Sequence, residues 1–306
     1  MTDTTKIICP HCKSREVVKR GYFQTEAKGK VQRYFCKSCS KKFIPQTAFY
    51  RMRNTPQKIT LCLDLFYRGV STRKVQEHLQ AFYPHNSSWV SIYNWVIKYS
   101  KQISKFTDKL KVNIGQEVQI DEVEYHRRKS HKAKKGIEVN WLIDSVCPET
   151  KFMLNADYLK SRQMKNVKQI LNNLKERTNN KIQTITTDGF LLYRKVVNKT
   201  FGYDKHSCKF NVKHNVVNAS KGQGFNHPIE RLHNNLRART KTFRGFHGSV
   251  ESANAIMKGL SIYYNFITKH QAINCCPYEL AIPELKDKLN VNNKWLELIQ
   301  LSNQNI

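Results

Sequence analysis

The chain has 306 residues, with 53 Lys and Arg against 23 Asp and Glu, which gives a formal net charge of +30. This length is enough for a catalytic domain with small accessory modules, and the charge suits a polyanionic partner, above all nucleic acid. The sequence has no apolar run of about 18 residues and begins without the apolar stretch of a signal peptide, which argues against a membrane role. We therefore expect a cytoplasmic, nucleoid-associated protein whose nine cysteines are thiols or metal ligands.

Residues 1–48 are predicted to form a zinc ribbon. Two Cys-x-x-Cys pairs lie in turn-like knuckles and supply four thiolate ligands to one tetrahedral Zn²⁺: Cys9, Cys12, Cys36 and Cys39. Strand-like segments at residues 17–19 and 32–35 lie between the pairs. So small a module buries little apolar surface, and the metal would supply the missing folding energy. Redox chemistry is the alternative, although it needs one pair only, and His11 is expected at the surface.

Residues 49–112 predict three short helices and a linker. Thr55-Pro56 opens the first helix and Gly69 ends it, Ser71 caps the second, and Ser88 opens the third. This pattern favours a helix-turn-helix, with a plain three-helix packing module as the alternative. Three polar positions of the third helix are expected to face DNA in the major groove: Ser91, Asn94 and Lys98. Four apolar positions of that helix are expected in the core: Trp89, Ile92, Trp95 and Val96.

Residues 113–285 carry the pattern of an α/β domain, and residues 286–306 follow as a C-terminal tail. Strands are predicted at residues 116–125, 139–146, 151–159, 181–190 and 203–210, and helices at residues 161–178, 191–201 and 226–241. A lysine-rich loop is expected just before the last helix. By analogy, three strands, helix, strand, helix, strand and helix is the order of a ribonuclease-H-like domain, a mixed sheet flanked by helices.

Three acids in this domain are the candidate ligands for the divalent metal, Mg²⁺ or Mn²⁺, that phosphodiester cleavage uses. Asp121 lies in the middle of a strand, where Asp is disfavoured without a reason. Glu122 and Glu124 compete with it, although strand alternation turns both to the opposite face. Asp188 ends a strand before a glycine, which also suits an ordinary turn. Glu230 lies in the first turn of the last predicted helix.

The last predicted helix has two distinct faces. An apolar stripe anchors it: Ile229, Leu232, Leu236 and Phe243. A polar stripe with helical spacing lies beside it: Glu230, His233, Asn234 and Arg237. A solvated face would explain the charges but not the ordered mixture of acid, amide and cation. For His214 and His233, contact with DNA and a surface or packing role are equally open.

The segments QIDEVEY, TTDG and HPIERLHNNLRARTKTFRGF resemble the three carboxylate motifs of the DDE transposases of insertion sequences, and most of all insertion-sequence family six. The later segment YYNFITKHQAINCCPYELAIPEL resembles their closing motif, so the resemblance covers about residues 113–285. It implies that Asp121, Asp188 and Glu230 are catalytic metal ligands and that Arg237 lies near DNA. Asp188 and Glu230 are separated by 41 residues, more than is usual in that family, and the surplus is expected in residues 213–224.

The resemblance implies a transposase that binds double-stranded DNA, both terminal inverted repeats and target. It would catalyse two-metal strand cleavage and strand transfer without a covalent protein–DNA intermediate, and it would act as a homodimer or larger homo-oligomer because two ends must be cut together. Two alternatives stay open. One is a DNA-binding regulator with an inactive nuclease-like domain, and the other is a nuclease without strand transfer.

Overall fold

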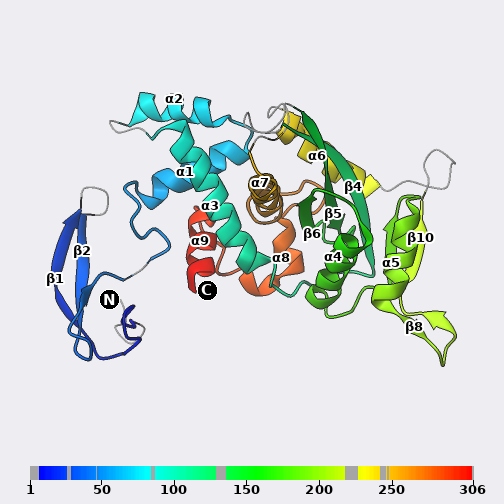
Figure 1. Cartoon of the computed structure of the whole chain (residues 1–306), viewed down its shortest axis with the longest axis horizontal. Helices are drawn as coiled ribbons and strands as arrows, with labels where there is room; N and C mark the ends of the chain where they lie inside the picture. The colour runs from blue at the N-terminus through cyan, green and yellow to red at the C-terminus, as the bar shows by residue number, and fades with distance from the viewer. Residues whose placement is uncertain are drawn as a thin grey trace.

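The structure is a computed structural model that describes residues 7–25, 29–45, 47–83, 87–128, 136–217, 227–241, 246 and 248–304. Along the longest axis of the molecule, a small N-terminal sheet lies at one end and the largest sheet lies toward the other (Figure 1). A group of helices lies between them. The small sheet, the group of helices α1 to α3 (residues 56–107) and the large sheet therefore follow one another in space as they do in the sequence.

The N-terminal module is a three-stranded antiparallel sheet of order β1-β2-β3. β1 (Val17–Thr25) pairs with β2 (Gly29–Cys36), which also pairs with β3 (Lys42–Phe43), so both predicted strand segments are confirmed. The only buried side chains in its core cluster are Cys9, Tyr34, Cys36 and Phe43, among the residues that the structure describes. Four side chains are a very small core, so this module has little apolar burial to hold it together.

The helical module begins with α1 (Pro56–Tyr67), α2 (Thr72–Phe82) and α3 (Trp89–Thr107). Each predicted helix start is confirmed: the hydroxyls of Thr55, Ser71 and Ser88 accept a hydrogen bond from the backbone N–H three residues on, at 3.3, 3.3 and 3.2 Å. Each helix start is thus set by a local side-chain bond that the sequence alone can predict.

The third helix buries most of its predicted apolar positions. Ile92, Trp95 and Val96 are buried as expected. The prediction for Trp89 is wrong, because this side chain is 41% exposed and lies against Arg73, whose guanidinium carbon is 4.9 Å from the ring centre. Trp89 is the first residue of α3, where a side chain can point past the end of the core.

The largest sheet has five strands in the order β10-β7-β4-β5-β6. Its strands are β4 (Glu117–Arg128), β5 (Ile137–Val146), β6 (Met153–Leu159), β7 (Thr184–Thr187) and β10 (Lys213–Val216). β4, β5 and β6 form an antiparallel meander, while β7 lies parallel to both β4 and β10. The predicted α/β class with a mixed sheet flanked by helices is confirmed.

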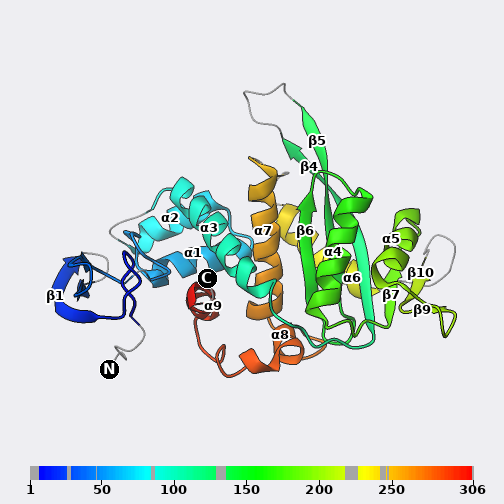
Figure 2. The same ribbon diagram turned by 60° about the horizontal axis from the view of Figure 1, so that its bottom comes forward.

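Helices cover both faces of this sheet. α4 (Met164–Arg177) and α5 (Leu191–Phe201) lie on one face, and α6 (His227–Thr240) and α7 (Val250–Ile262) lie on the other (Figure 2). The strand that carries the first candidate acid, β4, is thereby placed between two helical layers near the centre of the sheet.

One strand of the sheet differs from the prediction. Residues 203–210 form a separate two-stranded hairpin, β8 (Tyr203–Asp204) and β9 (Lys209–Phe210), so the fifth strand predicted there is wrong. The fifth strand is β10, in a segment that the sequence assigned to a loop. Its sequence, KHNV, lacks the alternation of a half-buried strand, and β10 pairs only with β7. Residues 218–226 and Phe243 lie outside the described residues.

The C-terminal segment returns to the helical module. After the π-helical turn η4 (Tyr263–Ile267), α8 (Pro277–Ala281) and the 3-10 turn η5 (Pro283–Leu285), the chain ends in α9 (Lys294–Gln304). Trp295 of α9 stacks on Tyr67 of α1 at 5.3 Å between ring centres, and its indole N–H donates to Asp64 at 3.2 Å. Residues 286–306, predicted as a tail, therefore contain a helix packed on α1.

The helical module and the large sheet share one continuous hydrophobic core. α7 lies between them, and a Cβ on its Gly259 would overlap the buried hydroxyl of Tyr67, which is hydrogen-bonded to Ser100 at 2.6 Å. Asn265, in the Tyr-Asn-Phe segment, accepts from the backbone N–H of Met153 and donates to its carbonyl, at 2.9 and 2.8 Å.

Within the described residues, no helix combines the length and the apolar character that crossing a membrane requires.

Candidate active site and metal centres

An acid cluster forms where β4 passes the end of β7. β4 and β7 are parallel, with Gln119 opposite Thr186, and continuing this register brings Asp188 beside Asp121. One carboxylate oxygen from each of Asp121, Glu122 and Asp188 lies within 4.8 Å of the others. Three oxygen ligands converging in this way suit a hard divalent cation such as Mg²⁺.

Glu122 belongs to this cluster although its partners lie on the other face of the sheet from those of Asp121. Its carboxylate accepts from Arg162 at 2.5 Å and from the Tyr193 hydroxyl at 2.6 Å, and its side chain is only 4% exposed. The Arg162 guanidinium is itself enclosed by Trp141 and Phe190, with its central carbon 3.9 and 4.3 Å from the ring centres. Strand alternation thus separates the neighbours of the two acids but does not keep their carboxylates apart.

Asp121 is held between its own backbone and a buried histidine. One oxygen accepts the N–H of Glu122 at 2.8 Å, and the other lies 3.7 Å from Nδ1 of His233 on α6. Burial raises the pKa of Asp121 to about 6, against the opposing effect of His233. The raised pKa means that the carboxylate charge is poorly solvated, which favours occupation of the site by a cation.

His233 also binds a second acid that the sequence analysis did not single out. Asp144 on β5 stands directly opposite Asp121 in the β4–β5 ladder, and its fully buried carboxylate lies 2.8 Å from Nε2 of His233. Its second oxygen is buried without a hydrogen-bond partner among the described residues. Burial lowers the pKa of His233, but Asp144 and Asp121 raise it by more, so the net shift of this pKa is upward.

The surface role considered for His233 is therefore wrong, because the residue is 4% exposed. A signal for Asp144 does exist in the sequence: it is an acid in the otherwise apolar strand segment VNWLIDSV, the same reason that pointed to Asp121. No comparable local signal exists for Arg162 or Tyr193, because their contacts with Glu122 join distant parts of the chain.

Replacing His233 by Leu should lower the free energy of unfolding by about 3 kcal/mol, because the buried Asp144 carboxylate then loses its ionic partner. Urea denaturation of the zinc-loaded protein measures this loss. The double variant H233L/D144L should recover most of it, since no buried charge remains. Losses that simply add in the double variant would show that the two residues do not stabilise each other.

Glu230 lies apart from the three clustered acids. It is in the first turn of α6 and 48% exposed, and its carboxylate lies 3.7 Å from Nδ1 of His227. It precedes His233 by three residues, so the two side chains lie on neighbouring positions of one helix face. Glu230 is thus on the face of α6 that meets β4, one turn before the residue that contacts Asp121.

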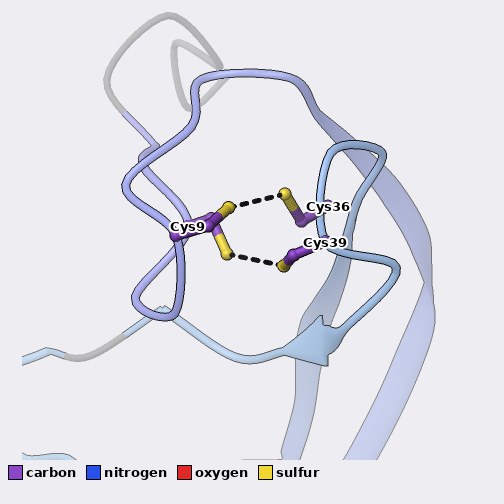
Figure 3. A group of neighbouring side chains, drawn as sticks. Cys9, Cys36 and Cys39 are labelled. Atoms are coloured by element: carbon purple, nitrogen blue, oxygen red, sulfur yellow. Dashed lines mark hydrogen bonds between the residues drawn. The ribbon is translucent and has the colours of Figure 1, made fainter.

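The four cysteines of the N-terminal module converge from its two knuckles (Figure 3). The Sγ atoms of Cys9 and Cys39 are 3.6 Å apart, and those of Cys12 and Cys36 are 3.4 Å apart. Four sulfurs around a tetrahedral zinc at about 2.3 Å would be roughly 3.8 Å from one another, so the spacing fits Zn²⁺. The pKa of Cys36 is lowered to about 6. Burial raises this pKa, but the backbone N–H of Cys39 and the neighbouring thiols lower it by more.

The residues predicted to contact DNA occupy two separate elements. On α3, Asn94 and Lys98 are exposed, whereas Ser91 is half-buried and its N–H donates to the cap at Ser88. On α6, Arg237 is exposed and acts electrostatically on His233. His214 on β10 is half-buried, with its Nε2 2.9 Å from the hydroxyl of Thr187, the residue before Asp188.

Comparison with known proteins places the chain in a family. The family model described as "Transposase, Mutator family" matches residues 11–233, well over half of the chain, a span that includes three of the four clustered cysteines, the acid cluster and His233. No curated protein was found that matches the chain. The match supports the transposase class predicted from the carboxylate motifs, while the closer likeness to insertion-sequence family six stays a prediction. By this match, the chain belongs to the Mutator family of transposases.

Proposed function

We propose that this protein is a DDE-type transposase that binds the terminal inverted repeats of its element and catalyses metal-dependent DNA strand cleavage and strand transfer. The observation that carries the proposal is the convergence of Asp121 and Asp188 from two parallel strands, in a chain that belongs to a transposase family. The strand order β10-β7-β4-β5-β6 supports a ribonuclease-H-like catalytic domain. The carboxylate motifs and the Tyr-Asn-Phe segment support a likeness to insertion-sequence family six.

The donor set of the acid cluster fits a divalent cation. Asp188 forms no ion pair in the part of the chain that the structure describes, and the burial that raises the pKa of Asp121 leaves its charge in need of a counter-ion. We assign Asp121 and Asp188 as ligands for Mg²⁺ or Mn²⁺. When bound, the metals would activate the attacking oxygen and stabilise the oxygen that leaves.

Glu230 is proposed as the third catalytic acid, in preference to Glu122. Both oxygens of Glu122 already accept charge-assisted or hydroxyl hydrogen bonds, from Arg162 and Tyr193, in a site closed to solvent. Glu230 is half exposed, and it precedes His233 on the face of α6 that meets β4. The third metal ligand must be accessible to metal and DNA from solvent, and Glu230 meets this requirement better than Glu122. Glu122 instead positions β4 beside Asp121.

The proposed reaction consists of two direct displacements at phosphorus, without a covalent protein intermediate. In cleavage, water forms a bond to phosphorus and the bond to the 3′ oxygen breaks, which frees a 3′ hydroxyl. In transfer, that hydroxyl oxygen forms a bond to a target phosphorus, and the bond from this phosphorus to the target's 3′ oxygen breaks, which frees a 3′ hydroxyl on the target strand. Arg237, near the acids on α6, would hold a DNA phosphate, and the negative backbone would be drawn to the chain by its +30 charge.

DNA recognition is proposed for the two N-terminal modules. Asn94 and Lys98 are exposed on α3, as readers of the major groove must be, and Ser91 lies half-buried on the same helix. Zn²⁺ held by the four cysteines would stabilise the ribbon. Because two element ends are cut together, a homodimer or larger homo-oligomer is the expected active form, in the cytoplasm at the nucleoid.

The test is a cleavage assay with the full-length, zinc-loaded chain and a labelled duplex that carries the inverted repeat flanking its gene. With Mg²⁺ or Mn²⁺ we expect a nick that leaves a 3′ hydroxyl at the element end, and no product without added divalent metal. A pre-cut duplex should then join to a supercoiled target plasmid.

The alternatives give different results in the same assay. Nicking without joining of pre-cut ends would identify a nuclease, because hydrolysis then occurs without strand transfer. Specific binding of the repeat with no nicking in either metal would identify a DNA-binding regulator. Failure to bind the repeat at all would remove the transposase proposal for this chain.

A further inference from the structure

A cationic cavity lies beside α6, on the flank that carries His227 and Arg231. The cavity has a volume of about 170 Å³. Its lining includes side chains from the start of α6, the β5–β6 turn and the segment after η4, of which six are polar or charged: Lys151, His227, Arg231, Asn235, Tyr264 and His270. No acidic residue lines it among the residues that the structure describes. The cavity therefore concentrates positive charge and hydrogen-bond donors.

The two permanent cations act on the same point of the cavity. Burial lowers the pKa of His270, and Lys151 and Arg231 lower it further, so both cations lie within electrostatic reach of this ring. Neither cation forms an ion pair within the described part of the chain. Two cations with no acid between them favour an anion in the space that they share.

His270 is arranged to donate a hydrogen bond. Its Nδ1 accepts the backbone N–H of Ala272 at 3.2 Å, so the neutral ring carries its proton on Nε2. Its ring also packs edge-on against Tyr264, with 6.1 Å between ring centres, which fixes the orientation of the ring. A lowered pKa keeps the ring neutral, and it then donates through Nε2 without adding a charge.

The position of the cavity relates it to the acid cluster. Arg231 directly follows Glu230, and on a helix these two positions point about 100° apart. His227 and Pro228, also in the lining, belong to the first turn of α6, where the positive end of the helix dipole favours anions. One flank of the helix thus faces the metal-binding acids, and the other presents donors.

We propose that this cavity binds one phosphate group of the DNA backbone and so fixes the duplex across α6. This inference rests on the proposed function for the identity of the DNA, but the phosphate site itself does not require that the chain cleave DNA. A duplex lying over α6 would have one phosphate held by Arg231 and Lys151, with neighbouring phosphodiesters directed toward Glu230, Asp121 and Asp188.

The test compares two double variants of the full-length, zinc-loaded protein without added Mg²⁺. Arg231→Gln with Lys151→Gln removes both cations of the cavity. Lys165→Gln with Lys168→Gln removes two exposed cations of α4, on the opposite face of the sheet, and is the matched control. Fluorescence anisotropy measures the affinity for a labelled 30-base-pair duplex between about 0.05 and 0.3 M salt, and thermal unfolding checks that both variants fold.

In the cavity variant, affinity should fall roughly tenfold or more at 0.15 M salt, and the slope of log K against log salt should decrease in magnitude by about 1, since the loss of one phosphate contact removes about 0.9. The loss should be equal for the element end and for unrelated DNA, because a phosphate carries no sequence information. Affinity and slope equal to those of the α4 variant would overturn the proposal.

A second arm distinguishes free phosphate from DNA. If titration calorimetry finds that inorganic phosphate binds the wild type and not the cavity variant, while DNA affinity is unchanged, the cavity takes free phosphate and the DNA assignment is overturned. If DNA binding falls as expected but no cleavage occurs in any metal, the phosphate site stands and the proposed transposase activity fails. The two proposals can therefore fail separately.

Discussion

Replacing Asp188 by Asn, or Glu230 by Gln, is expected to reduce metal-dependent strand cleavage roughly a thousandfold. Residues that only support a metal ligand cost about 10- to 100-fold when removed, so a ligand itself should cost more. Thermal unfolding of both variants should match the wild type, because Asp188 and Glu230 are partly exposed and form no short ion pair in the described structure. A single-turnover nicking assay in Mg²⁺ measures the loss, and binding of Mn²⁺ followed by calorimetry gives a readout that is independent of activity.

The matched comparison is Glu122→Gln, which tests the choice of the third acid. This change leaves Arg162 without its charged acceptor and should lower the free energy of unfolding by about 1–3 kcal/mol. Its effect on cleavage should be tenfold at most, if Glu122 positions rather than binds. Loss of Mn²⁺ binding in the Glu122 variant together with full activity in the Glu230 variant would reverse the assignment.

Removal of zinc is expected to unfold the N-terminal module while the large sheet stays folded. Structural zinc sites contribute on the order of 10 kcal/mol to folding, far more than a core of four buried side chains can replace. Cys36→Ser should have the same effect as a zinc chelator, and hydrogen exchange should show loss of protection in β1 and β2 only. Affinity for the element end should then fall strongly.

Cys208→Ser is the control for this experiment, because Cys208 is exposed and lies outside the four-cysteine cluster. It should retain zinc, protection and DNA binding. Retained protection in β1 and β2 after complete zinc release, measured with a colorimetric chelator, would contradict the proposed role of the metal.

Much of the local structure was predictable because short-range chemistry determines it. Thr55, Ser71 and Ser88 start their helices through hydrogen bonds that span only three residues. The meeting of Asp121 and Asp188 was expected from the carboxylate motifs, and it is made by the parallel pairing of β4 and β7, which brings the residue after the end of β7 beside the middle of β4.

The remaining contacts depend on pairing between distant segments. Asp144 meets His233 only because the β4–β5 register places it opposite Asp121 and α6 packs over that pair. β10 escaped prediction because KHNV has no alternation of its own and becomes a strand by pairing with β7. Burial of Glu122 beside Tyr193 and Arg162 likewise follows from tertiary packing and not from its position in β4.

The close approach at Gly259 bears on the distance along the DNA between the bound repeat and the cut. Because α7 approaches Tyr67 closely at Gly259, and Trp295 of α9 stacks on the same tyrosine, the helical module cannot rotate relative to the large sheet without breaking a shared core. If α3 binds the terminal repeat, the rigid connection between α3 and the large sheet fixes the number of base pairs between the recognised sequence and the cut phosphodiester. Gly259→Ala, which forces the two bodies apart, should move or blur the position of the cut before it abolishes cutting.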